Sequence, residues 1–406
     1  MAPLRLPSGP RETYNLFVIS GRGCDIQNMP KAISVSEVLR LLEIKAPSGT
    51  ALPYDNVGLL AGDPAWETRG AVLCIDLSEQ AIELARRKGY RLIINHHPCI
   101  FPRSRGMSRV TSGDGVGGLV FEALRQGIAV IACHTNFDTC ALEVPHAVAE
   151  GLGFEMKGRL HESSREQLLK LVTFVPETHL DAVRLAVFDA GAGQIGNYDC
   201  CGFTAAGEGS FRGGVETRPF IGKTGEQERA REIRFETILP RGLERSVLRA
   251  LREAHPYEEI AYDLYPVEQT PGGKGLARGL GFGVWGEFSK PRSFPELVKS
   301  VRGVFKVEGF MMSEPAPKRV RRVAFAAGKG ADFADSARAA GCDLFITGEA
   351  GYHVVLESAR KGLAIMELGH RESEIFFTPT VKGWLSEIGL PAAELSRATQ
   401  KVWTAT

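Results

Sequence analysis

The chain has 406 residues, of which 44% are apolar and 24% charged, as in ordinary soluble globular proteins of about two or three domains. Lys and Arg (49) nearly balance Asp and Glu (48), which argues against a dedicated nucleic-acid or membrane-surface binder. No apolar run approaches the ~20 residues that cross a bilayer, and we expect no secretory signal. Eight dilute cysteines without a C-x-x-C motif predict a reduced, cytoplasmic protein.

The first 30 residues differ from the rest of the chain. Residues 1–30 lack hydrophobic periodicity and are rich in Pro, Gly and Arg, so we expect a poorly ordered tail. Met29 lies just before a predicted helix over 34–43, which Ser34 or Ser36 can cap. One hypothesis is therefore that Met29 is the true start of the protein.

Residues 31–164 show an alternation of strands and helices from residue 71 onward. Apolar runs predict strands over 71–76, 91–95 and 128–134, and helical periodicity predicts helices over 78–89, 116–127 and 143–153. The order βαβαβα is typical of a mostly parallel sheet covered by helices, so the fold class is α/β.

The same rhythm returns in residues 269–406. The predicted strands are 322–328, 343–347 and 363–368, and the predicted helices are 331–341, 352–362 and 376–389. Residues 71–98 can be laid over 323–350, which indicates two similar halves of one domain. Chance similarity between two βαβ units is the alternative.

Residues 165–268 interrupt the two halves with a different pattern. Strands are predicted over 171–177, 198–205, 231–240 and 258–267, with helices over 178–191 and 243–254. The order βαββαβ is that of the ferredoxin-like split unit, which can fold as an α+β domain of its own. Residues 268–275 are rich in Gly and predict a linker.

Five potential metal ligands follow predicted strands. His96 and His97 come directly after the strand over 91–95, and Asp138 follows the next strand. His370 and Glu374 are four residues apart where a helix should begin, so they lie on one face of a turn. Each has an ordinary alternative: hydrogen-bonded histidines, or acidic residues that suit a helix N-terminus.

Taken together, these five residues predict a metal site more strongly than any of them does alone. Ligands collect at the carboxyl ends of parallel strands, and overlaying the halves brings Asp138 within about a residue of Glu374. Three imidazoles and two carboxylates suit a centre of two divalent ions, ~3.5–4 Å apart, that activates water. Zn, Mn, Fe and Ni are all compatible with this ligand set.

Four motifs resemble one protein family. The chain closely resembles the dinuclear-metal-centre hexameric proteins, the NGG-interacting-factor-three-like family, whose bacterial members are often called type 2 GTP cyclohydrolase I homologs. The resemblance covers about residues 33–400 and rests on His96-His97-Pro98, HTNFD (134–138), DNVGLLAGDP (55–64) and GHRESE (369–374). The insert is similar to the PII-like module of the longer members through VTFVPE, AGAGQIGNYDCCGF and AHPYEEIAYDLYP.

The resemblance implies a set of roles. The family's metal ligands match His96, His97, Asp138, His370 and Glu374, and its glutamate bridges the two ions. Arg371 stands where members usually have an aromatic residue. The implied protein is a homohexamer and a metal-dependent hydrolase of a small molecule, in which metal-activated water opens the purine ring of GTP.

Other candidates have less specific signals. His134 and His353 are candidate general acids or bases, with plain hydrogen-bonded histidines as the alternative. Glu349 is a further candidate near the site, and Lys329 or Arg371 can meet phosphate. The rival functions are a metal-bound regulatory or scaffold protein without turnover, suggested by the ferredoxin-like insert, and a nucleotide phosphoesterase.

Overall fold

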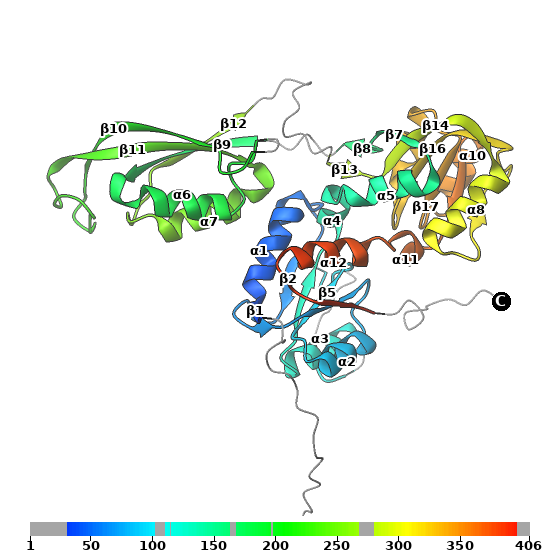
Figure 1. Ribbon diagram of the computed structural model, residues 1–406, viewed down its shortest axis with the longest axis horizontal. Coiled ribbons are helices and arrows are strands. Elements are labelled where there is room, and N and C mark those ends of the chain that lie inside the picture. The colour runs from blue at the N-terminus through cyan, green and yellow to red at the C-terminus, as the bar shows by residue number, and fades with distance from the viewer. Residues whose placement is uncertain are drawn as a thin grey trace, which may run out of the picture.

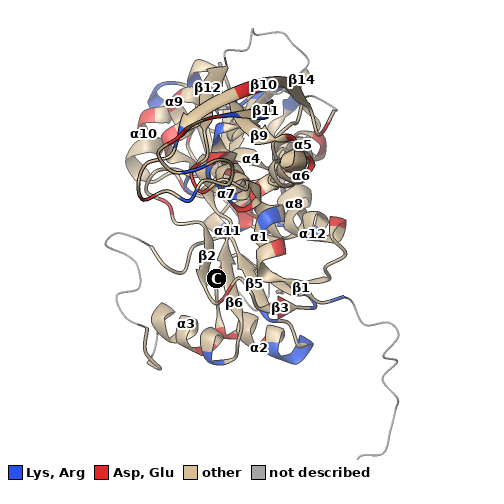
Figure 2. Cartoon of the chain, turned by 90° about the vertical axis from the view of Figure 1, so that its left-hand side faces the viewer, with Lys and Arg blue, Asp and Glu red and all other residues tan. Residues whose placement is uncertain are grey.

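The computed structural model describes residues 31–101, 110–113, 115–162, 168–195, 198–267 and 280–395 and forms a mixed α/β protein with several sheets (Figure 1). The predicted tail over 1–30, with Met29, and the predicted linker over 268–275 lie outside these residues. Within the described part of the chain, no helix has the length and apolar character needed to span a membrane. Figure 2 shows Lys and Arg interspersed with Asp and Glu over the molecule.

The first large sheet has five strands in the order β19-β4-β5-β6-β2, with only β2 antiparallel to its neighbour. Its three central strands are buried apolar runs because helices cover both faces. Helices α2 and α3 cover one face, and α1 and α12 cover the other. The bounds are β2 (Gly58–Ala61), β4 (Ala71–Cys74), β5 (Leu92–Asn95), β6 (Ala129–Ala132), β19 (Ala392–Glu394), α1 (Val35–Lys45), α2 (Glu79–Lys88), α3 (Val116–Arg125) and α12 (Phe377–Glu387).

The second large sheet has six strands in the order β15-β18-β17-β16-β14-β7, and β16, β17 and β18 are parallel. Helices α5 and α8 pack on one face, while α9 and α10 pack on the other. The bounds are β7 (Glu155–Gly158), β14 (Val284–Ser293), β15 (Met311–Met312), β16 (Arg319–Ala326), β17 (Leu344–Thr347), β18 (Ala364–Glu367), α5 (Glu143–Leu152), α8 (Phe294–Phe305), α9 (Ala334–Ala339) and α10 (Tyr352–Arg360).

The expected boundaries at 31–164 and 269–406 do not separate these two sheets. Strand β7 and helix α5 precede the insert but pack with the second sheet. Conversely, α12 and β19 lie near the end of the chain but complete the first sheet, and Figure 1 shows α12 beside α1. Trp384 Nε1 on α12 donates to Glu143 Oε1 on α5 at 2.8 Å. This hydrogen bond connects a helix of the first large sheet with a helix of the second.

Short elements complete this part of the molecule. Two small two-stranded sheets pair β1 with β3 and β8 with β13. The short helices α4 and α11 each follow a central strand of one large sheet. The bounds are β1 (Ile33–Ser34), β3 (Glu67–Thr68), β8 (His161–Glu162), β13 (Gly281–Phe282), α4 (Thr135–Cys140) and α11 (His370–Ser373), with 3-10 turns over Ser48–Thr50 and Gly330–Phe333.

The insert has an antiparallel sheet in the order β10-β11-β9-β12, with α6 and α7 on one face around a core of its own. This is the βαββαβ element order of the split unit. The bounds are β9 (Leu168–Pro176), α6 (Leu180–Asp189), β10 (Gly202–Arg212), β11 (Gln227–Pro240), α7 (Glu244–Ala254) and β12 (Tyr262–Val267), with 3-10 turns over Glu177–His179 and Arg241–Leu243. The strand predicted from residue 198 was wrong at its start, since Cys200 has a φ of 51° and β10 begins at Gly202.

Local sequence signals explain several helix ends. Of the two candidate caps for α1, Ser34 is the N-cap. Its hydroxyl accepts from Glu37 N at 3.2 Å, and its own backbone N–H donates to Glu37 Oε2 at 2.9 Å. This reciprocal capping box satisfies two backbone donors that the first turn leaves open. Helix α2 ends at Gly89, whose φ of 68° lies in the left-handed region that glycine adopts without strain.

Candidate metal centre

Two adjacent histidines leave the first sheet where β5 ends. The backbone N–H groups of His96 and His97 both donate to Ile75 O, at 3.1 and 2.9 Å, so the end of β4 fixes the turn. The side chain of Asn95 donates to His97 O and closes the turn from the other side. These bonds hold two neighbouring imidazoles at the carboxyl end of the sheet, with ring centroids 5.1 Å apart.

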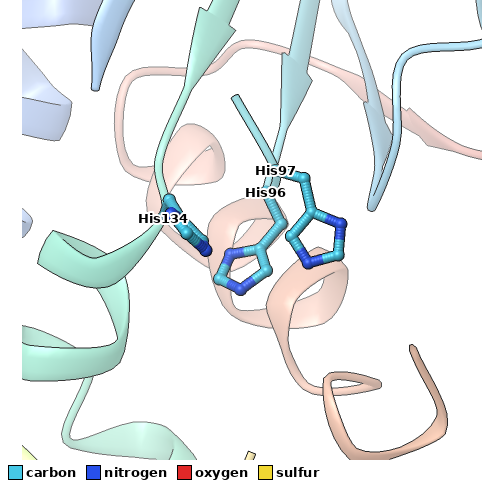
Figure 3. A group of neighbouring side chains, drawn as sticks. All are labelled: His96, His97 and His134. Carbon is cyan, nitrogen blue, oxygen red and sulfur yellow. The ribbon is translucent and has the colours of Figure 1, made fainter. Parts of the chain in front are cut away.

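The next strand and the second sheet supply the other predicted ligands. His134 precedes α4 and Asp138 lies one turn later, with Asp138 N donating to His134 O at 3.0 Å. On the second sheet, β18 is followed by Gly369, with a φ of 100°, and then by His370 at the start of α11. Figure 3 shows His96, His97 and His134 gathered below the strand ends.

The side chains of the five predicted ligands meet around one buried carboxylate. Glu374 Oε2 lies 3.1 Å from His97 Nε2, and Glu374 Oε1 lies 3.1 Å from His370 Nε2. His96 Nε2 lies 3.7 Å from Glu374 Oε1 and 3.8 Å from Asp138 Oδ1. Ligand atoms of His97, His370 and Glu374 all lie within 4.8 Å of one another, as do those of His96, His97 and His134. Residues separated by more than 270 positions in sequence therefore form one cluster.

Three buried polar atoms of this cluster make no hydrogen bond of normal geometry in the described part of the chain, namely His96 Nε2, His97 Nε2 and Glu374 Oε2, although the last two face each other at 3.1 Å. Buried polar atoms without partners are rare and call for an explanation such as an ion. The backbone leaves room beside them, because a Cβ at Gly328 would lie 2.7 Å from Glu374 Oε1. Imidazole nitrogens and carboxylate oxygens are ligands for divalent transition metals, so the donor set fits a metal centre.

The other nitrogen of each ring is held in a way that suits ligation. His96 Nδ1 lies 2.9 Å from Cys133 O, so it donates to this carbonyl and leaves Nε2 as the atom with the free lone pair. His97 Nδ1 lies 2.8 Å from Asp76 Oδ1, which gives the carboxylate–histidine pair common around metals. His370 Nδ1 lies 3.3 Å from Glu349 Oε1.

The electrostatics of the metal-free cluster are strongly perturbed. Burial alone would raise the pKa of Glu374, but the surrounding imidazoles of His96, His370 and His97 outweigh it and hold that pKa well below its usual range. Burial opposes the charged form of His97, yet the Asp76 carboxylate at its Nδ1 and the Glu374 carboxylate 3.1 Å from its Nε2 raise the pKa to about 10. The carboxylate of Glu374 and the protonated imidazoles thus stabilise each other in the absence of metal. Divalent cations would compete with protons for the same imidazole nitrogens.

His134 faces the cluster and is oriented by a second carboxylate. Its Nδ1 lies 2.9 Å from both oxygens of Asp55, and Thr135 N donates to Asp55 Oδ2 at 3.0 Å. Burial raises the pKa of Asp55, but the hydrogen bonds from His134 and Thr135 prevail and lower it to about 2. The ionised Asp55 fixes the ring, so the arrangement suits a base that accepts a proton at Nε2.

A cavity of about 920 Å³ opens onto this cluster. His97, His134, Asp138, His370 and Glu374 line it, and so do Tyr54, Lys329 and Phe333. His353 does not line this cavity and its side chain is exposed at the start of α10, where its ring contacts Tyr352. Arg371 lies beside the cluster but its Nη2 points to Glu372, at 3.3 Å.

Two carboxylates beside the histidines were not predicted as their partners. Asp76 was not singled out, although it lies two residues after the end of β4 and so at the same carboxyl edge as His96 and His97. Asp55 was named only as part of the motif DNVGLLAGDP (55–64), in which DNVG is an ordinary turn sequence. The position of Asp76 after a buried strand could have predicted its place beside the histidines. Nothing in the sequence indicates that Asp55 pairs with His134, which lies 79 positions away.

Comparison with known proteins places the chain in a family. The family model described as Duf34/NIF3 (NGG1p interacting factor 3) matches residues 33–399. The chain belongs to this family. A Bacillus subtilis protein named GTP cyclohydrolase 1 type 2 homolog is 34% identical over 347 residues, which cover 86% of this chain and 91% of that protein. A Halalkalibacterium halodurans protein of the same name is 34% identical over 338 residues, or 83% and 88% of the two chains.

Solved structures agree with this assignment. A crystal structure of a Bacillus cereus protein related to NIF3 matches with a TM-score of 0.68 and 30% identity, covering 93% of this chain and all of that chain. The match extends over both large sheets and the insert together, because it leaves only a small share of the chain uncovered. The family expected from the four sequence motifs is thereby confirmed.

Proposed function

We propose that this Duf34/NIF3 protein is a metal-dependent hydrolase with two divalent ions held by His96, His97, Asp138, His370 and Glu374. The observation that carries the proposal is the convergence of the buried atoms His96 Nε2, His97 Nε2 and Glu374 Oε2, which lie close together without a hydrogen bond of normal geometry in the described chain. Glu374 would help to hold both ions, since its two oxygens approach different histidines. When bound, such ions lower the pKa of water from 15.7 toward ~7 and polarise an electrophile.

The protein's own residues have distinct tasks in this proposal. Asp76 and Cys133 O hold the imidazoles of His97 and His96 with Nε2 directed inward. His134, held by Asp55, accepts a proton at Nε2 from the attacking water and returns it to the leaving group. Lys329 lines the cavity and attracts an anionic substrate such as a phosphate ester.

The names of the relatives suggest a substrate. Two proteins 34% identical to this chain are named GTP cyclohydrolase 1 type 2 homolog. We therefore propose GTP as the first substrate to test, with hydrolytic opening of its five-membered ring and release of formate. We further propose that the protein acts in the cytoplasm as a homohexamer, which light scattering on the purified protein would reveal.

A panel assay tests the proposal. Protein loaded with Zn, Mn, Fe(II) or Ni is incubated with GTP and with phosphate esters, and formate and phosphate are measured. Formate release supports the cyclohydrolase, while phosphate release indicates a nucleotide phosphoesterase on the same site. The His97→Ala variant should lose both metal and turnover. Full metal content in this variant would contradict the proposed ligand set.

A second comparison separates the two histidines proposed as proton carriers. His134→Gln should keep its bound metal but lose about 10²–10⁴-fold in turnover, because it removes a general base. His353→Gln should keep most of its activity, since this side chain is exposed and outside the cavity lining. The reverse order of effects would show that His353 carries the proton.

A regulatory protein without turnover is the second candidate. It is favoured by a cavity in the insert whose lining residues are all distinct from those of the metal cavity. Well-metallated protein that turns over none of the panel but binds a small molecule through the insert would favour this function over the hydrolase.

A further inference from the structure

The insert contains a cavity of about 660 Å³, which lies within the size range of small-molecule sites. It is formed where the hairpin β10–β11 extends past the end of β9, with the segment over 213–221 and the start of the segment over 257–261 closing its sides. The Gly207-Glu208-Gly209 stretch of β10 forms part of its wall. None of its lining residues belongs to the metal cluster.

Glu232 is the central polar group of this cavity. It lies on β11 opposite Gly207, and only 9% of its surface is exposed. Its Oε1 accepts a hydrogen bond from Tyr257 OH at 2.9 Å. Its Oε2 lies over Gly209, where any Cβ would overlap it, so the glycine makes room for the carboxylate. Among the described residues, no Lys, Arg or His nitrogen lies within ion-pairing distance of this carboxylate.

Several neighbouring charges on the cavity wall are already engaged, and the exposed Arg212 also lines the cavity. Arg234 Nε donates to Glu236 Oε1 at 2.7 Å, with its guanidinium over the ring of Phe174. Glu208 accepts from Arg229 at 3.2 Å. The Glu258 side chain accepts from the backbone N–H of Arg218 at 2.8 Å. Glu232 is therefore a buried carboxylate without a direct ion pair among the described residues, and burial of a charge without one is costly.

Aromatic rings face the same space. Phe220 lies 6.1 Å from Tyr257 between ring centroids, and it packs edge-on against His179 at 5.4 Å. Although Phe220 lines the cavity, it is 53% exposed, so its ring is open to a ligand. The faces of aromatic rings attract cations, most strongly when water is excluded.

We propose that this cavity binds a small organic cation, a primary or quaternary ammonium that carries an apolar or aromatic group. The ammonium pairs with Glu232 and the apolar part lies against Phe220 and Tyr257. Anions are disfavoured, because the carboxylates of Glu208, Glu232, Glu258 and Glu259 outnumber the guanidinium groups that line the cavity, those of Arg212 and Arg234. The site is separate from the metal centre, so its occupancy does not depend on the proposed hydrolase activity.

Calorimetric titration of the full-length protein with phenethylammonium, choline and putrescine tests this proposal, with 3-phenylpropionate as the anion of matched shape. At least one cation should bind below about 10 mM, and 3-phenylpropionate should not. Glu232→Gln should weaken that binding at least about tenfold, the change expected for one charge-assisted contact. Glu253→Gln, an exposed substitution on α7 outside the cavity, should leave it unchanged.

Gly209→Ala provides an independent check, because its methyl group would displace the Glu232 carboxylate without changing charge. It should weaken the same cation, while thermal unfolding shows whether the insert remains folded. The proposal is overturned if no cation binds, if 3-phenylpropionate binds equally well, or if a folded Glu232→Gln protein binds the cation as the unmodified protein does. Binding that disappears on metal removal would also contradict it.

Discussion

Replacing Asp76 with Asn should weaken metal binding without removing a ligand. Asp76 Oδ1 accepts from His97 Nδ1 at 2.8 Å and so keeps Nε2 free for a metal. An Asn can turn its amide toward Nδ1 and favour the tautomer that carries a proton on Nε2. Loss of such a partner typically costs about 10–100-fold in affinity. Because the Asp76 side chain is 58% exposed and water screens its charge, we expect the low end, about tenfold or ~1.4 kcal/mol.

The assay is a competition titration of metal-free protein against a chromophoric chelator, with Zn and Mn in turn. The matched control is Asp332→Asn, which changes an exposed carboxylate that lines the same cavity. Asp332→Asn should leave the metal affinity unchanged. If the loss of one negative charge near the cavity were enough to weaken metal binding, both variants would show the same loss of affinity. Equal affinities for Asp76→Asn and the unmodified protein would refute the idea that this carboxylate orients a metal ligand.

Three further predictions concern stability. Metal at about 100 times its Kd should raise the free energy of unfolding by about 2.7 kcal/mol, and an unfolding temperature unaffected by chelator would contradict metal binding. Ser34→Ala should cost about 1 kcal/mol in denaturant unfolding by removing the hydroxyl that caps α1. The backbone N–H of Ser34, which alanine keeps, and the Ser34 hydroxyl, which alanine lacks, both lower the pKa of Glu37, so the part of the cost due to the hydroxyl should be full above the ordinary Glu pKa and shrink as pH falls; a cost that grows in acid would be inconsistent. Phe377→Ala should cost about 3–5 kcal/mol, because this ring is 1% exposed and packs 4.8 Å from His96. A loss under about 1 kcal/mol would show that the cluster is not supported by this packing.

The sequence predicted the central strands well because they are short buried runs with helices between them. The runs that became β4, β5 and β6 are apolar except for Asn95 at the end of β5, as is typical of strands covered on both faces. His96, His97 and Asp138 could be predicted as candidate ligands because ligands collect where such strands end.

No comparable pattern in the sequence indicated that β7 belongs to the second large sheet and β19 to the first. Strand β19 consists of three residues, Ala392–Glu394, and β7 is partly exposed and polar, so neither shows a strand period. Their partners are chosen by tertiary contact with β4 and β14. The cavity of the insert is equally invisible in the sequence, since Glu232 and Tyr257 meet only after folding.

Metal content measured together with anomalous scattering tests the central claim most directly. Protein purified without chelator and supplied with Zn or Mn should carry two ions per chain, with His96, His97, Asp138, His370 and Glu374 as their protein ligands. Glu374→Gln should lose at least one of them, because its carboxylate is the group that the imidazoles of both His97 and His370 approach. A chain that binds no metal in this crevice, or a Glu374→Gln variant with an unchanged pair of ions, would contradict the account.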